Sequence, residues 1–269
     1  MALIEIPQVL TIAGIDSSGG AGVNTDTRLF ALEEVYAATV ITGVTAQNTY
    51  GVRSLSATQE QLLIAQLDSV FSDLDIKAMK TGALFNAQVV KTLASYLSKI
   101  ANIPLVIDPV MVAKGGAKLL SDEAITLLVH DLLPFAYLVT PNTSEAEVMT
   151  GISIENEPDM LRAAKMIQAL GVDNVLIKGG HMKGENVSDL LYTSEGQTYW
   201  YHNPRFDTIR THGTGDTLSA YITAHLAKGE YLPDILPAAT AYMSQVIQQE
   251  INVGHGHGPL NLWAKKDRH

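Results

Sequence analysis

Short runs of apolar, mostly β-branched residues alternate with longer amphipathic stretches along nearly the whole chain. Six of the runs are predicted strands, and most are apolar on both faces, as in parallel strands covered by helices on each side: residues 9–13, 39–45, 75–81, 104–107, 137–140 and 174–178. Apolar residues at helical spacing mark the other stretches: residues 58–71, 86–99, one beginning at 121, 213–228 and 233–249. This alternation predicts an α/β fold with a mainly parallel central sheet and right-handed crossovers.

One segment departs from this alternation. Residues 189–193 and 198–202 alternate polar and apolar side chains across the turn at 194–197, which predicts a β-hairpin at the edge of the sheet. The sequence contains no Pro-, Ser- or Gly-rich linker and no internal repeat. We therefore predict a single domain over residues 1–269.

Composition excludes several classes of function. The chain has 18 Lys and Arg against 28 Asp and Glu, a net charge of −10, which argues against nucleic acid as a partner. It has no cysteine, so disulfides, thiolate nucleophiles and Cys-ligated metals are excluded. We find no secretory signal and no apolar stretch of about 18 residues, so we predict a cytoplasmic protein that does not enter a membrane.

The most informative segment is residues 210–220, Arg-Thr-His-Gly-Thr-Gly-Asp-Thr-Leu-Ser-Ala. Gly213 and Gly215 precede a predicted helix, and a helix N-terminus with close-approaching backbone N–H groups binds anions. Asp216 lies in the first turn, where an acid can simply interact with the helix dipole. Beside a bound phosphoryl group it can also accept the proton of an alcohol nucleophile. The P-loop, dinucleotide and protein-kinase motifs are absent.

Polar residues also follow the first two predicted strands, where open α/β sheets bind ligands. Gly14 begins a glycine-rich turn, and the next helix carries Asp26. Gln47 lies in the loop Thr-Ala-Gln-Asn-Thr, and its amide can read an adjacent amine and ring nitrogen. A tight turn and an ordinary loop amide remain alternatives for these two loops.

Three later strands end in charged or capping residues. Asp108 follows a fully apolar strand and could face a metal or a phosphate. Asn142 or Thr143 is expected to cap a helix that has Glu145 in its first turn. Lys178 stands at a strand end, where the phosphate oxygens of a nucleotide would pass.

In combination and in order, these segments resemble the ribokinase superfamily. Within its vitamin-kinase branch they are most similar to the hydroxymethylpyrimidine/phosphomethylpyrimidine kinases of thiamine biosynthesis. The similar segments are residues 9–26, 44–52, 107–120, 140–151, 176–181, 210–220 and 253–259. The resemblance implies a ribokinase-like three-layer α/β/α sandwich and phosphorylation of a hydroxymethyl group, with ATP and Mg²⁺ as cofactors. It also implies a second phosphorylation, of the monophosphate, and a homodimer.

The resemblance assigns expected roles to the matching positions. It places the substrate pyrimidine at Gly14, Asp26, Gln47 and Val110. It places ATP at Asn142, Lys178, Thr211 and Gly215, and the magnesium at Glu145 and Asp108. The anion hole and the proton acceptor would be Gly213, Thr214, Gly215 and Asp216.

Two positions depart from the family pattern. Asp216 stands where this branch usually has Cys, although the wider superfamily uses Asp, and Ala83 stands where the branch commonly has Met on the pyrimidine. The missing Met side chain predicts a roomier pocket. A pyridoxine, pyridoxal and pyridoxamine kinase of vitamin B6 salvage is therefore the alternative. A non-catalytic vitamin sensor is disfavoured, because it needs no base at Asp216. His255 and His257 lie in a C-terminal Gly-His-Gly motif that could equally be a solvated turn.

Overall fold

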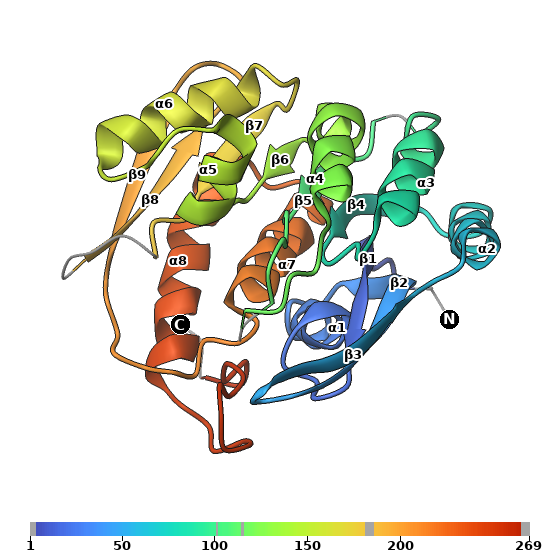
Figure 1. Cartoon of the computed structure of the whole chain (residues 1–269), viewed down its shortest axis with the longest axis horizontal. Helices are drawn as coiled ribbons and strands as arrows, with labels where there is room; N and C mark the ends of the chain where they lie inside the picture. Colours follow the sequence, from blue (N-terminus) through green and yellow to red (C-terminus); the bar gives the residue numbers. More distant parts are fainter. Residues whose placement is uncertain (1–3, 101, 114–115, 181–185, 265–269) are drawn as a thin grey trace.

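The computed structural model describes residues 4–100, 102–113, 116–180 and 186–264, and within them nine strands form one sheet. Three positions of the similar segments (114, 115 and 181) lie outside the described residues. The order across the sheet is β3-β2-β1-β4-β5-β6-β7-β8-β9 (Figure 1). The strands are β1 (Gln8–Asp16), β2 (Tyr36–Asn48), β3 (Gly51–Ala57), β4 (Ile76–Thr81), β5 (Leu105–Ile107), β6 (Leu138–Val139), β7 (Asn174–Ile177), β8 (Asn186–Tyr192) and β9 (Thr198–Pro204).

The pairing of these strands confirms a mainly parallel sheet with an edge hairpin. Strands β2, β1, β4, β5, β6 and β7 pair in parallel, and β8 and β9 form the antiparallel hairpin. Strand β3 pairs antiparallel with β2 at the opposite edge of the sheet, and this strand was not predicted. As a result Gln47, which we expected in a loop, lies on β2 opposite Val52.

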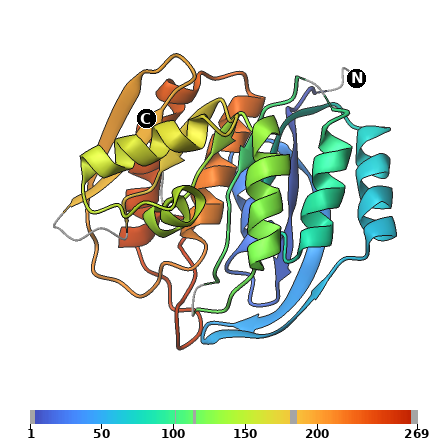
Figure 2. The same ribbon diagram turned by 45° about the horizontal axis from the view of Figure 1, so that its top comes forward.

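Eight α-helices in the described residues cover both faces of the sheet, as expected. They are α1 (Gly22–Leu32), α2 (Glu60–Phe71), α3 (Ala87–Leu97), α4 (Asp122–Leu127), α5 (Thr143–Thr150), α6 (Glu157–Gln168), α7 (Thr214–Ala227) and α8 (Leu232–Gln248). Helices α2 to α6 pack over one face, and α1, α7 and α8 pack over the other (Figures 1 and 2).

Alternation along each strand builds the two apolar layers. On β5, Leu105 and Ile107 enter the layer under α2 to α6, and Val106 enters the layer under α1, α7 and α8. Among the polar side chains that interrupt the second layer are Thr11 on β1 and Lys80 on β4, both fully buried. Their position under α1 and α7 matters for the site described below.

The C-terminal segment folds back onto the turn between β2 and β3 (Figure 1). The N–H of His257 donates to the backbone oxygen of Thr49 at 2.7 Å, and the N–H of Gly256 donates to Thr49 Oγ1 at 3.1 Å. The Gly-His-Gly motif therefore holds this turn through its backbone.

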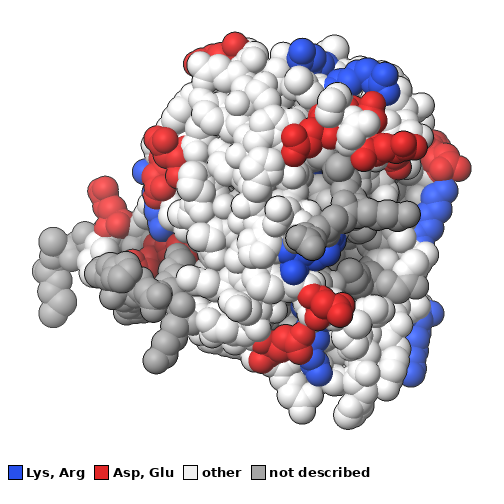
Figure 3. Space-filling model, turned by 90° about the vertical axis from the view of Figure 1, so that its left-hand side faces the viewer, with Lys and Arg blue, Asp and Glu red and all other residues white. Residues whose placement is uncertain are grey.

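The charged side chains on the surface and the apolar character of the helices can be compared with the sequence predictions. On the face shown in Figure 3, basic side chains lie singly or in small groups among acidic ones. Among the described helices, none combines the length and the apolar character needed to cross a bilayer.

Candidate active site

A cavity of about 600 Å³ opens at the carboxyl ends of the parallel strands, between β1, β2, β5, β7 and the start of α7. Twelve of the predicted site residues line it: Gly14, Gln47, Asp108, Val110, Asn142, Glu145, Lys178, Thr211, Gly213, Thr214, Gly215 and Asp216. Asp26 is fully buried beneath the cavity rather than on its wall. The sheet thus brings together residues that the sequence spreads over 200 positions, from Gly14 to Asp216.

The N-terminus of α7 forms the anion-binding end of the cavity. Gly213 caps the helix in the left-handed region with φ of 85°, and a Cβ there would lie 2.1 Å from the backbone oxygen of Gly20. A Cβ on Gly215 would lie 2.9 Å from a carboxylate oxygen of Asp108. Glycine at both positions therefore allows the first N–H groups of α7 to face the cavity at close range.

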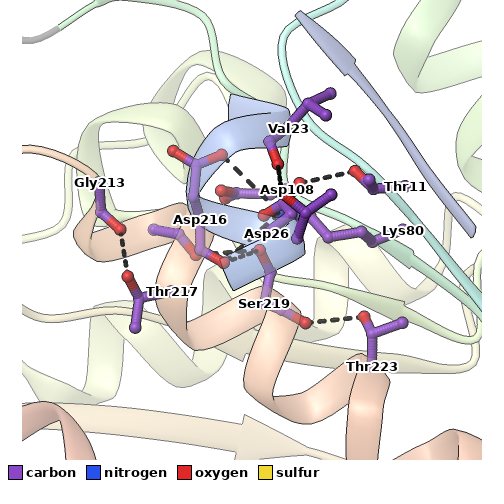
Figure 4. Close-up of polar contacts among 12 residues, drawn as sticks. Thr11, Val23, Asp26, Lys80, Asp108, Gly213, Asp216, Thr217, Ser219 and Thr223 are labelled. Carbon is purple, nitrogen blue, oxygen red and sulfur yellow. Dashed lines mark hydrogen bonds and ion pairs between the residues drawn. The ribbon is translucent and has the colours of Figure 1, made fainter. Parts of the chain in front are cut away.

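Asp216 has a buried partner that sequence reasoning missed. Lys80 Nζ lies 3.7 Å from Asp216 Oδ1 and 2.6 Å from Asp26 Oδ1 (Figure 4). Thr11 donates a hydrogen bond to the other Asp26 oxygen at 2.6 Å. The available signal was a lysine on the same face as Ala78 in the predicted strand at residues 75–81.

Three charged residues meet where the phosphates of a nucleotide would lie. Lys178 Nζ lies 3.0 Å from Asp108 Oδ1, which also accepts a hydrogen bond from Thr140. Burial alone would lower the pKa of Lys178, but the carboxylates of Asp108 and Glu145 raise it, so the ammonium stays charged. Burial raises the pKa of Glu145 to about 7, against the opposing effect of Lys178.

Glu145 also confirms the predicted helix cap. The Asn142 side chain accepts from the N–H of Glu145 at 2.9 Å, and Glu145 Oε2 accepts from the N–H of Asn142 at 2.8 Å. These reciprocal bonds form a capping box that fixes the Glu145 carboxylate at the cavity wall.

The donor set fits a magnesium ion that arrives with a nucleotide. Asp108 and Glu145 supply hard carboxylate oxygens, the type that Mg²⁺ prefers. Within the described residues there is no cluster of three or more His, Cys, Asp or Glu that could hold a metal by itself. Mg²⁺ commonly uses one or two carboxylates and completes its shell with phosphate oxygens and water.

The substrate end of the cavity contains a hydrogen-bonded group that the sequence did not reveal. His212 Nε2 lies 2.7 Å from Asp16 Oδ2 and 3.1 Å from the side-chain nitrogen of Gln47. A carboxylate only accepts, so His212 Nε2 carries the hydrogen and cannot accept from Gln47. The Gln47 side chain therefore lies against the His212 ring, and its oxygen accepts a hydrogen bond from the Thr45 hydroxyl at 3.2 Å.

Asp16 anchors this group to the glycine-rich turn. Its oxygens accept from the N–H and hydroxyl of Ser18 and from the N–H of Gly20. Burial alone would raise the pKa of Asp16, but the hydrogen bonds from His212 and Ser18 outweigh burial and lower it. A charged Asp16 thus fixes His212, which in turn fixes Gln47.

Phe85 lies in the cavity wall together with Ala83. Both line the cavity, and a Cβ on Gly14 would lie 2.4 Å from the Phe85 ring. Phe85 has a positive φ of 65°, an uncommon and strained conformation for a bulky residue that is often found at functional sites. An aromatic side chain from the same loop as Ala83 therefore forms part of the cavity wall.

The fold and this set of residues define a ribokinase-like kinase that phosphorylates a small molecule with ATP. The chain is similar to the phosphomethylpyrimidine kinase structure from Clostridium difficile, with a TM-score of 0.80 and 37% identity over 90% of this chain and 100% of that one. It is also similar to the ADP complex of Bacillus subtilis pyridoxal kinase, with a TM-score of 0.88 and 32% identity over 97% and 98%.

Sequence comparison then identifies the family to which the chain belongs. The chain is 44% identical over 263 residues to the hydroxymethylpyrimidine/phosphomethylpyrimidine kinase of Haemophilus influenzae, covering 97% of this chain and 98% of the relative. The family model for phosphomethylpyrimidine kinase matches residues 16–261, and the chain belongs to this family.

Proposed function

We propose that this enzyme phosphorylates the hydroxymethyl group of 4-amino-5-hydroxymethyl-2-methylpyrimidine with MgATP, and then phosphorylates the resulting monophosphate, as a step of thiamine biosynthesis. The observation that carries this proposal is one cavity lined both by Gln47 and by Asp216 in the first turn of α7. A ring held by Gln47, Gly14 and Val110 would present its hydroxymethyl group to Asp216.

The first transfer follows from this geometry. As the alcohol oxygen bonds to the γ-phosphorus of ATP, its proton passes to Asp216, and the bond from that phosphorus to ADP breaks with its electron pair leaving on ADP. The N–H groups of residues 213–216 stabilise charge on the transferring group, each at about 3 kcal/mol. Asn142, Lys178 and Thr211 would hold the nucleotide, and Asp108 and Glu145 would hold its magnesium, which would supply charge neutralisation at the phosphates.

A panel of alcohols tests this function directly. We expect ADP release with hydroxymethylpyrimidine and with its monophosphate, and little with ribose. If pyridoxine or pyridoxal has a much higher kcat/KM than both pyrimidines, the vitamin B6 alternative is correct. That alternative has specific support, because the Bacillus subtilis pyridoxal kinase gives a TM-score of 0.88 and Ala83 departs from the pyrimidine-kinase pattern.

Replacement of Gln47 by Ala should affect only the pyrimidine. The truncation leaves buried polar partners unsatisfied, at about 1–3 kcal/mol, so we expect KM for the pyrimidine to rise roughly 5- to 150-fold. KM for ATP should stay within about twofold. Gln66→Ala is the matched control, since Gln66 bonds the backbone of Ile41 outside the cavity and should lower only the Tm. Equal changes in both KM values would show that Gln47 is structural.

Binding of MgATP should release a proton from Glu145. With its pKa at about 7, this carboxyl is about half protonated at pH 7, and only the ionised form ligates magnesium. Calorimetry in buffers of different ionisation enthalpy should show release of about half a proton at pH 7 and almost none at pH 8.5. Affinity should weaken below pH 7. Glu145→Gln should abolish the release and Glu147→Gln, on the same helix, should not; unchanged release in Glu145→Gln contradicts the assignment.

The proposal also includes the domain organisation, the cellular location and the oligomeric state of the enzyme. It acts as a single-domain kinase in the cytoplasm and as a homodimer. Support for the dimer comes from exposed apolar side chains on the β2–β3 hairpin at the sheet edge, Val44, Tyr50 and Leu55. Light scattering at micromolar concentration should give about twice the 29.0 kDa of one chain, and a mass near 29.0 kDa would refute the dimer.

A further inference from the structure

A lysine–aspartate pair lies directly behind Asp216 and has no part in the mechanism above. Lys80 is fully buried on β4, Asp26 is fully buried on α1, and the Asp216 side chain is 13% exposed at the cavity wall. Lys80 Nζ lies 2.6 Å from Asp26 Oδ1, 3.7 Å from Asp216 Oδ1 and 3.4 Å from the Asp216 backbone oxygen (Figure 4). The ammonium thus contacts the side chain and the backbone of the same residue.

Stability alone does not account for this pair. It interrupts the apolar layer formed by Ala78 on β4 and by Leu29 and Phe30 on α1. Taking two charges out of water costs about as much as their attraction returns, and apolar replacements of similar volume are often as stable. A role in the adjoining site is the better account of a buried ion pair at this position.

The charges around Asp216 show what Lys80 does there. The charged groups that interact with its carboxylate are Lys80 on β4, Asp26 on α1 and Lys178 after β7. Asp16, at the end of β1, is instead paired with His212. Burial raises the pKa of Asp26 to about 7, against the opposing effect of Lys80. Burial would lower the pKa of Lys80, but Asp26, Asp216 and Asp108 raise it, so Lys80 stays charged.

We propose that Lys80 is a positioning residue for phosphoryl transfer: anchored by Asp26, its ammonium group holds the Asp216 carboxylate at the cavity wall, where the alcohol proton arrives. This inference rests on the proposed role of Asp216 as proton acceptor. Thr11 and Asp26 fix the ammonium from behind, so Asp26 acts on the reaction through Lys80.

Two variants with opposite expected effects test the proposal. The double variant Lys80→Met with Asp26→Leu removes both buried charges, whereas Lys80→Met alone would leave Asp26 buried and unpaired. Without the cation, the acid limb of the kcat/KM profile should move to higher pH by about one to three units. In Asp26→Asn the full charge of Lys80 acts on Asp216, so the same limb should move to lower pH.

The double variant should melt near the parent temperature, whereas Asp26→Asn should melt lower because it takes the 2.6 Å carboxylate partner from buried Lys80. Both should bind MgATP with parent affinity. A purely structural role predicts lower melting temperatures with an unmoved pH profile. The proposal is overturned if the acid limb of the kcat/KM profile stays in place in both variants, or if it moves in the same direction in both. The profile uses whichever alcohol the parent enzyme phosphorylates, pyrimidine or vitamin B6. A wrong substrate assignment would therefore appear in the parent, and a wrong role for Lys80 would appear only in the variants.

Discussion

Asp216→Asn should fold normally, bind MgATP with near-native affinity and lose about 10²- to 10⁴-fold in the rate of alcohol phosphorylation. Asparagine has nearly the same shape at the start of α7 but cannot accept the alcohol proton. If Asp216 were only a favourable first-turn acid, its loss would cost about 0.3–1 kcal/mol of stability and leave turnover intact. Measuring kcat and Tm on one preparation separates these outcomes.

The second phosphorylation provides an internal control for the same variant. A phosphate monoester has its second pKa near 6, so the monophosphate is already ionised at neutral pH and has no proton to give up as it attacks. We therefore expect Asp216→Asn to slow the second transfer much less than the first. Equal losses in both transfers would mean that Asp216 acts by something other than proton transfer.

Gly213→Ala should be the most damaging change that alters no charge. Its φ of 85° costs an L-residue about 1–2 kcal/mol, and the new Cβ would lie 2.1 Å from the Gly20 backbone oxygen, so the start of α7 must move. Displacing the N–H groups that face the phosphoryl group should lower kcat by about 10²- to 10³-fold.

Gly229→Ala is the matched control. Gly229 follows α7 at its other end with φ of 81°, and its added Cβ would meet nothing within 4 Å. The variant should lose the same conformational free energy, about 1–2 kcal/mol of stability, which appears as a lower Tm, and should keep parent turnover. Equal activity losses in both variants would place the effect in helix stability rather than in the anion-binding turn.

The fold was predictable because its signals are local. Apolar runs on both faces of a strand and apolar residues at helical spacing need no knowledge of distant residues, and they yielded the parallel sheet and the β8–β9 hairpin. The capping box between Asn142 and Glu145 was predictable for the same reason, since its partners lie three residues apart. Strand β3 was missed because its exposed sequence, Gly-Val-Arg-Ser-Leu-Ser-Ala, lacks a buried face.

The missed site residues depend on long-range contacts. Lys80 acquires its role from Asp26, 54 residues away, and from Asp216, 136 residues away. His212 meets Asp16 across 196 positions. Phe85 is an ordinary apolar residue in the sequence, and only its left-handed backbone and its contact with Gly14 place it in the cavity wall.

The central claim is two successive transfers to one pyrimidine, and the product of the reaction tests it most directly. Hydroxymethylpyrimidine, excess MgATP and the purified enzyme can be followed by ³¹P NMR over time. We expect the monophosphate signal to rise first and then to be replaced by the coupled signals of a diphosphate ester. Pyridoxal, in a parallel sample, should be phosphorylated more slowly. An unphosphorylated pyrimidine beside rapidly formed pyridoxal phosphate, or a reaction that stops at the pyrimidine monophosphate, would contradict the account.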